Sequence, residues 1–236
     1  EGLYPPIRGV LERGGVQELA IDNRVTTRKG AERVIRFAFE QSLKREGAPK
    51  DGTRRVTCVD KSNVMDGDRL FRKVYDEVAE EYGGVERDYA FVDAFMQWMI
   101  RTPEAYDVVV MGNMFGDIAT DLASVLQGGM GLAAGGNVGD DHAMFEPIHG
   151  SAPKHEGKDR ANPIAAVLAM QMMLAWLGER KGHAALGEAA VTVEAAVKAV
   201  LAEGKFLTQD LGGKAKASQT GDALAKRVTT LASSRE

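Results

Sequence analysis

One segment, residues 106–121, constrains the fold of this 236-residue chain more than any other. Residues 108–111 form a short apolar run of the kind found in a strand covered on both faces of its sheet, and two glycines mark a turn after it. A helix is expected to begin near Asp117. Residues spaced i and i+4 lie on one face of a helix, so Asp117 and Asp121 are expected to present two carboxylates side by side.

The two carboxylates allow two interpretations. Like charges repel unless a cation lies between them, and oxygen ligands on a rigid helix suit Mg²⁺ or Mn²⁺. Alternatively, Asp117 caps the helix and Asp121 is solvated, because acidic residues are common in the first turn of a helix. The pair alone leaves both interpretations open.

Composition and charge narrow the class of partner. Thirty basic and 34 acidic residues give a net charge of -4, so the chain has no basic stripe for nucleic acid and no polybasic membrane anchor. The longest apolar run, 163–177, is too short to span a bilayer. The only cysteine, Cys58, lies in a strand-like run, which indicates a packed core thiol, a reducing compartment and a cytoplasmic location. Small molecules are therefore the expected partners.

Hydrophobic periodicity predicts alternating helices and strands, and this alternation is typical of an α/β protein. Residues 3–27 suggest short strands or an extended arm, whereas 128–139 and 145–157 are expected to be loops rich in glycine. The other expected elements are strands at 55–60, 88–92 and 108–111, and helices at 29–43, 70–82, 94–100, 117–126, 163–177, 183–203 and 220–232.

Three ordered motifs carry a family resemblance. They are Asn113-Met-Phe-Gly-Asp-Ile-Ala-Thr-Asp121, Gly128-Gly-Met-Gly-Leu-Ala-Ala-Gly-Gly-Asn137, and Phe145-Glu-Pro-Ile-His-Gly-Ser-Ala-Pro153 followed by Ala161-Asn-Pro163. Together they resemble the β-decarboxylating dehydrogenases, the family of isocitrate, 3-isopropylmalate, homoisocitrate and tartrate dehydrogenases. The resemblance implies an α/β, isocitrate/isopropylmalate dehydrogenase-like fold with mixed sheets and flanking helices, and without a classical Rossmann nucleotide fingerprint.

The resemblance also implies how the chain is organised. Residues 1–105 are expected to be mostly the small domain with dimer-forming elements, and 106–236 the C-terminal part of the large domain with the metal and cofactor loops. The family's substrate-carboxylate arginines fall before the position of Glu1. We therefore expect an N-terminally incomplete chain.

The catalytic residues follow from the resemblance one by one. The ligands of a Mg²⁺ or Mn²⁺ ion fall on Asp117 and Asp121 of one subunit and on Asp93 of a partner subunit. Lys61 matches the lysine that assists deprotonation of the substrate hydroxyl across the subunit boundary, and Tyr4 matches the tyrosine that protonates the enol. A nearby dication lowers the pKa of both types of side chain and so favours proton transfer near neutral pH. Without the resemblance, the sequence would indicate that Asp93 caps a helix, that Lys61 is a solvated loop residue and that Tyr4 is a surface aromatic.

Cofactor binding is also inferred from the resemblance. Lys154 and His155 resemble the basic-aromatic pair of NADP-dependent members, whereas the loop at 208–213 resembles that of NAD-dependent members. NAD is narrowly favoured and NADP is the alternative. The residues expected to bind the cofactor are Glu146, His149, Gly150, Ala152, Lys154, His155, Asn162 and Asp210.

The expected function is metal-dependent oxidative decarboxylation of a 2-hydroxy acid that bears a 3-carboxylate, by a homodimer or higher oligomer with shared active sites. The segment from Glu1 to Tyr4 favours isocitrate, with 3-isopropylmalate and homoisocitrate as alternatives. A non-catalytic regulatory subunit and a generic nucleotide-binding scaffold are the competing classes. Retention of the whole catalytic set favours the enzyme.

Overall fold

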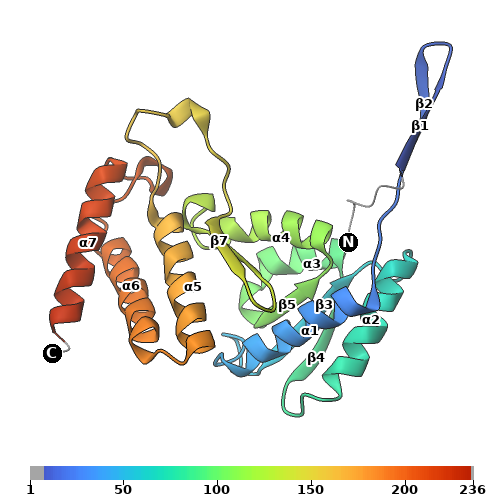
Figure 1. Cartoon of the computed structure of the whole chain (residues 1–236), viewed down its shortest axis with the longest axis horizontal. Helices are drawn as coiled ribbons and strands as arrows, with labels where there is room; N and C mark the ends of the chain where they lie inside the picture. Colours follow the sequence, from blue (N-terminus) through green and yellow to red (C-terminus); the bar gives the residue numbers. More distant parts are fainter. Residues whose placement is uncertain (1–7, 235–236) are drawn as a thin grey trace. The chain divides into compact units, whose positions relative to one another are not determined.

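The structure, a computed structural model, describes residues 8–234, and the chain forms two compact units, 1–123 and 124–236 (Figure 1). Each unit is described by itself. The expected division into a small-domain part, 1–105, and a large-domain part, 106–236, stays a prediction.

From residue 8 onwards, the first unit contains two strand systems and four helices. Its elements in chain order are β1 (Arg8–Arg13), β2 (Val16–Asp22), α1 (Arg28–Leu43), β3 (Arg55–Asp60), α2 (Asp66–Ala79), β4 (Glu86–Phe91), α3 (Val92–Arg101), the 3-10 turn η1 (Pro103–Ala105), β5 (Val108–Met111) and α4 (Asn113–Leu126), which continues past the unit boundary. The alternation of strands and helices from 28 to 126 confirms the predicted α/β class.

A three-stranded parallel sheet with the order β4-β3-β5 forms the centre of this unit. On one face, Val56, Cys58 and Val110 pack with the apolar residues of α1 and α2. On the other face, Val59 packs with residues of α3 and α4. Alternate residues of a strand point to opposite faces, so β5 is covered on both faces, as its apolar run predicts. It is, however, an edge strand of the described sheet, and only Val110 of its four residues is fully buried.

Helix α4 begins earlier than expected. The backbone N–H of Gly116 donates to the carbonyl of Gly112 at 3.0 Å, so the first helical turn lies directly after β5. Asp117 is therefore in the second turn, and its interpretation as the helix cap is wrong. A glycine inside a helix costs about 1 kcal/mol relative to alanine, too little to stop a helix that is packed on a sheet.

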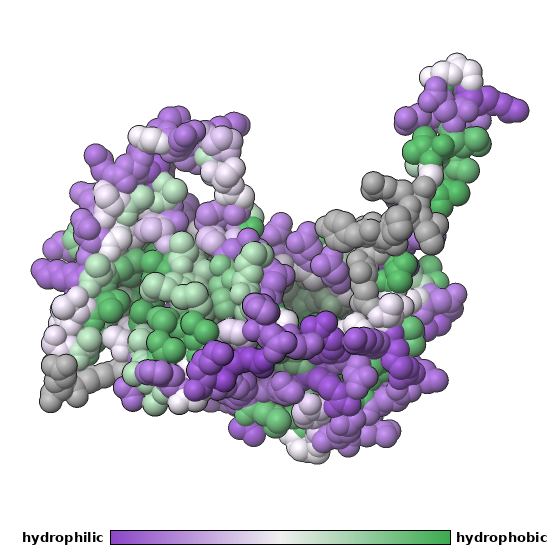
Figure 2. Space-filling model, viewed as in Figure 1, coloured by the Kyte–Doolittle hydropathy of each residue, from purple (hydrophilic) through white to green (hydrophobic). Residues whose placement is uncertain are grey.

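Strands β1 and β2 pair as an antiparallel hairpin with a register shift between Leu11 and Glu12. All seven residues of β2 are exposed. Large hydrophobic side chains are among them, and Figure 2 shows hydrophobic residues along the hairpin. The exposed ones are Val10, Leu11, Val16, Leu19 and Ile21.

The second unit contains an antiparallel ribbon and three long helices. Its elements are η2 (Met130–Leu132), β6 (Ala134–Val138), β7 (Ala143–Pro147), η3 (Pro153–His155), α5 (Ile164–Lys181), α6 (Ala184–Glu203), η4 (Gln209–Leu211) and α7 (Ala217–Ser233). Leu132, Ile164, Val197, Val200 and Leu224 form its buried core.

Part of the glycine-rich segment 128–139 is a strand rather than a loop. Gly136 lies in β6 directly opposite Phe145 of β7, and a Cβ at Gly136 would meet the Phe145 ring at 2.9 Å. The same pairing turns the start of the expected loop 145–157 into part of β7. Gly136 makes room for a side chain on the neighbouring strand, a requirement that composition alone does not reveal.

Helices α5 and α6 approach very closely at one point. Gly178 is buried, and a Cβ there would lie 2.8 Å from the backbone nitrogen of Gly187. Within the described residues, no helix is long and apolar enough to cross a membrane.

Candidate active site

Lys61 and Asp93 lie next to each other at the C-terminal ends of two parallel strands. Lys61 follows β3, and Asp93 is in the first turn of α3, directly after β4. The Lys61 Nζ donates to the Asp93 Oδ1 at 2.7 Å. This hydrogen bond holds the pKa of the Asp93 carboxyl below its usual range. The pair belongs to one chain, which suits the expectation that both residues act together at the same site.

The backbone beside Lys61 is fixed by a buried carboxylate. Asp60 is 1% exposed, accepts from the backbone N–H of Ser62 at 2.9 Å and forms an ion pair with Arg72 at 2.7 Å. The guanidinium of Arg72 also lies 4.8 Å from the ring centroid of Tyr89. Such paired charges at a strand end orient the turn that follows.

Asp117 and Asp121 are exposed side chains one helical turn apart on α4. Their carboxylates are the oxygen ligands that Mg²⁺ and Mn²⁺ prefer. Within residues 8–234, no group of three or more His, Cys, Asp or Glu side chains is arranged to hold a metal ion. The two aspartates therefore fit a cation as a partial ligand set, and Asp93 is not brought to them within this chain. Tyr4 lies outside the described residues.

A second cluster of expected residues surrounds a cavity in the second unit. Its volume is about 640 Å³, within the range of sites that hold a nucleotide-sized ligand. Six of the eight residues expected to bind the cofactor line it, and these are His149, Gly150, Ala152, His155, Asn162 and Asp210.

The wall of this cavity is built around Asn162. Its Nδ2 donates to the Asp210 Oδ2 at 2.9 Å, and its Oδ1 accepts from the backbone N–H of Ile164 at 3.0 Å, at the start of α5. Gly131 fits closely against both side chains, because a Cβ there would lie 2.5 Å from the Asp210 Oδ2 and 2.9 Å from the Asn162 Nδ2. The glycine-rich motif 128–137 thus lets the backbone pass close to Asn162 and Asp210, two residues expected to bind the cofactor.

Two of the residues expected to bind the cofactor, Glu146 and Lys154, do not line this cavity. The Glu146 Oε1 accepts from the Asn137 Nδ2 at 3.4 Å across the β6–β7 ribbon. The backbone oxygen of Lys154 accepts from the Lys158 Nζ at 2.7 Å. Their roles at the cofactor stay predictions.

Sequence reasoning missed several lining residues. Arg160 is the charged one, and within residues 8–234 it forms no ion pair with a carboxylate. Its position two residues before Asn162 is the only signal that points to it. The other missed residues are Met130, Gly131, Ala161 and Gln209.

Cys58 is fully buried in β3, as the sequence predicts. Burial raises the pKa of its thiol far above the usual range, with the nearby Asp60 carboxylate adding to the rise. A thiol in this state is a core residue and not a nucleophile.

Comparison with known proteins agrees with this architecture. The family model described as isocitrate/isopropylmalate dehydrogenase matches residues 1–226. The 3-isopropylmalate/3-methylmalate dehydrogenase of Methanocaldococcus jannaschii is 43% identical over 229 residues, which cover 97% of this chain and 65% of that protein. The homoisocitrate dehydrogenase of the same organism is 43% identical over 208 residues, covering 88% and 56%.

A solved structure is similar over the same length. The isocitrate dehydrogenase from Methylococcus capsulatus superimposes with a TM-score of 0.85 at 39% identity, covering 97% of this chain and 64% of that one. Fold and site geometry thus define an α/β protein with an isocitrate dehydrogenase-like fold. The chain belongs to the isocitrate/isopropylmalate dehydrogenase family. It spans about two thirds or less of the length of these relatives.

Proposed function

We propose that the protein of which this chain is part catalyses the metal-dependent oxidative decarboxylation of a 2-hydroxy acid that bears a 3-carboxylate, with NAD as the hydride acceptor. The observation that carries the proposal is the Lys61–Asp93 pair at the ends of β3 and β4, in a chain that also bears two exposed carboxylates one turn apart on α4. The named relatives act on acids with this common core, and isocitrate is the first substrate to test.

In this proposal each residue has one task. Lys61 of a second copy would assist removal of the proton from the substrate hydroxyl, and bound NAD would accept the hydride from the carbon that bears this hydroxyl. The 3-carboxylate then departs as CO₂, its bonding electrons remain as an enolate, and Tyr4 supplies the proton that converts the enol to the product ketone. A bound Mg²⁺ or Mn²⁺ ion supplies Lewis-acid stabilisation of negative charge on the substrate oxygens. Asp117 and Asp121 would hold that ion together with Asp93 of a second copy.

The proposal includes a homodimer. A two-stranded hairpin by itself is at best marginally stable in water, and exposed hydrophobic residues on an open edge favour pairing with another chain. Strands β1 and β2 have both features, because their large hydrophobic side chains are exposed. Pairing with the hairpin of a second copy would cover them and extend the ribbon.

The cofactor is proposed to bind in the cavity around Asn162. The cavity has the size and the polar side chains that an adenosine moiety requires, with His149 and His155 offering flat rings and Asp210 a hydrogen-bond acceptor. NAD is proposed because the 208–213 loop resembles that of NAD-dependent members, and NADP is the alternative tested beside it because Lys154 and His155 resemble the pair of NADP-dependent members.

The test uses the full-length protein with isocitrate, homoisocitrate, 3-isopropylmalate and tartrate, each with NAD⁺ or NADP⁺ and Mg²⁺ or Mn²⁺. Turnover with one of the acids, dependent on the metal, is the expected result. Binding of Mn²⁺ and substrate without any reduction of either nucleotide would instead identify a regulatory subunit, and turnover unaffected by metal removal would refute the metal chemistry.

Asp121→Asn sharpens this test. The exchange is expected to abolish activity and to leave the fold intact, because the side chain is exposed on α4. A matched control is Asp141→Asn, an exposed aspartate that is paired with Arg180 and lies outside the proposed site. Equal activity of the Asp121 variant and wild type would contradict the assignment of this residue as a metal ligand.

A further inference from the structure

Behind Lys61 lies a buried ion pair that the proposed reaction does not use. Asp68 of α2 has a side chain that is 2% exposed, and its Oδ1 accepts from the Arg24 Nη2 at 2.7 Å. Its other oxygen, Oδ2, accepts from the backbone N–H of Lys61 at 2.9 Å. One carboxylate therefore binds both a guanidinium and the main chain of the proposed catalytic lysine.

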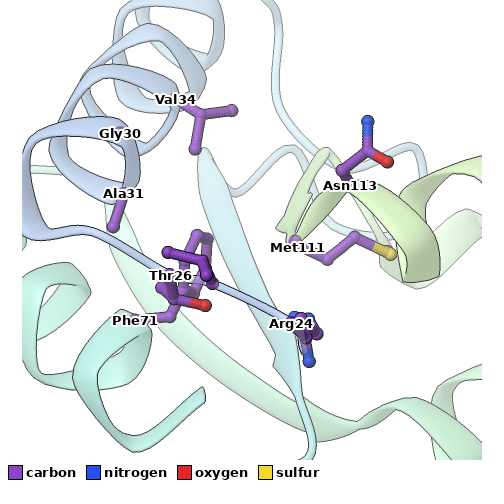
Figure 3. A pocket seen from close by; sticks show the side chains of 10 residues that line it. Arg24, Thr26, Gly30, Ala31, Val34, Phe71, Met111 and Asn113 are labelled. Atoms are coloured by element: carbon purple, nitrogen blue, oxygen red, sulfur yellow. The ribbon is translucent and has the colours of Figure 1, made fainter. Parts of the chain in front are cut away.

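Arg24 is itself held on several sides. Its side chain is only 10% exposed, its Nη1 donates to the Met65 Sδ at 3.4 Å, and its guanidinium lies 4.7 Å from the centroid of the Phe115 ring on α4. A Cβ at Gly112 would lie 2.5 Å from the Arg24 Nη2. Figure 3 shows Arg24 in the pocket that Met111 and Asn113 also line, at the junction of β5 and α4. The guanidinium thus connects α2 with the start of the helix that carries Asp117 and Asp121.

The main chain of Lys61 is fixed at both of its polar groups. Its N–H donates to the Asp68 carboxylate, and its carbonyl accepts from the backbone N–H groups of Val64 at 3.0 Å and Met65 at 2.9 Å. A lysine side chain has four rotatable carbon bonds, so its ammonium keeps one place only when the residue is held at both ends, at the backbone by Asp68 and at the Nζ by Asp93. Groups that orient a reacting residue are commonly worth one to two orders of magnitude in rate.

From this geometry we infer that Asp68 is a positioning residue for Lys61, and that Arg24 keeps the Asp68 carboxylate in the place where it binds the Lys61 N–H. The inference rests on the proposed function only for the task of Lys61. The arrangement itself is a property of the chain and is tested without turnover.

The test is the rate at which an amine-acylating reagent modifies Lys61 at one fixed pH, measured by mass spectrometry. The exposed Lys73 on α2 is the internal reference. In Asp68→Asn, the Lys61 amino group is expected to leave its partner Asp93 more often, so that its acylation rate rises several-fold relative to Lys73. Glu80→Gln is the matched control, because Glu80 is an exposed carboxylate at the C-terminal end of the same helix, away from the Lys61 turn, and is expected to leave both rates unchanged.

Arg24→Lys is the second variant, in case loss of the buried carboxylate prevents folding. It keeps the positive charge but loses the forked geometry, and it is expected to raise the Lys61 rate in the same direction. An unchanged Lys61 rate in a folded Asp68 or Arg24 variant would overturn the inference.

Kinetics provide the second readout. In the active full-length protein, Asp68→Asn is expected to lower kcat roughly 10- to 100-fold while leaving the dissociation constant of the nucleotide unchanged, and Asp68→Glu is expected to restore part of the rate. A purely structural role would lower the apparent kcat only in proportion to the number of nucleotide-binding sites that remain folded, and that result would overturn the inference. Absence of turnover in the wild type would refute the proposed function and not the positioning, which the acylation rates decide.

Discussion

Gly131→Ala tests whether the close fit of the glycine-rich turn shapes the cavity around Asn162. The new Cβ would lie 2.5 Å from the Asp210 Oδ2 and 2.9 Å from both Cβ and Nδ2 of Asn162, whereas heavy atoms in contact are normally about 3.5–4.0 Å apart. The Asp210 carboxylate and the Asn162 amide must therefore move, and their 2.9 Å hydrogen bond is the interaction that is lost.

The magnitude follows from that bond. A hydrogen bond to a charged group contributes about 1.5–3 kcal/mol, and the lower end applies because the Asp210 side chain is exposed. Since 1.4 kcal/mol corresponds to a factor of ten in a dissociation constant, nucleotide binding is expected to weaken about tenfold. Calorimetric titration with ADP-ribose measures the change. Gly221→Ala is the control, because a Cβ at that position of α7 meets no atom within 4 Å. Equal affinity of the Gly131 variant and wild type would show that the fit has no bearing on the cavity.

Three further outcomes are expected from the first unit. Tyr75→Phe removes the buried hydrogen bond from the Tyr75 hydroxyl to the Val56 carbonyl and should lower the free energy of unfolding by about 1–2 kcal/mol in urea denaturation, so an unchanged midpoint would contradict it. Cys58 should not react with a thiol reagent at pH 8 until the protein is unfolded, because its raised pKa leaves no thiolate, and rapid labelling of the native protein would argue against that burial. Lys61→Ala should raise the pKa of Asp93 towards its ordinary value in an NMR titration. Because the pKa of Asp93 is lowered in the folded state, the ion pair is fully formed above the ordinary carboxyl pKa and is lost as the pH falls through the folded-state pKa. An Asp93 titration that does not change in Lys61→Ala would exclude the pair.

The strands and helices of the sheet were predictable because each has one dominant pattern. The apolar runs at 55–60 and 108–111 are strands, and the helical spacing from Leu70 to Tyr82 identifies the core of α2. The errors concern glycine. Gly112 and Gly116 suggested a longer turn than the structure has, and Gly136 is a strand residue because the Phe145 ring needs its space. The sequence shows that a glycine lacks a side chain, but only the folded structure shows which neighbouring group occupies the space.

The candidate site was also only partly predictable from the sequence. Its chemical groups follow from motifs, but the contacts that hold them depend on distant parts of the chain. Arg24 and Asp68 are 44 positions apart and lie in segments with no motif, so nothing in the sequence joins them. Arg160 lines the cavity because the loop between β7 and α5 returns towards Gln209, a path that local propensity does not determine.

If the proposed homodimer forms through the β1–β2 hairpin, protein concentration becomes a variable in folding. Its hydrophobic side chains lie in water on the single chain, so any copy that covers them stabilises the folded state by mass action, and the unfolding temperature should rise with concentration. The same open edge can also pair wrongly with strands of other chains. This risk is greatest for newly made chains that have not yet met a folded partner. The ribbon also carries charged residues of both signs, among them Glu12, Arg13 and Glu18, and charged side chains along an open edge work against unrestricted stacking.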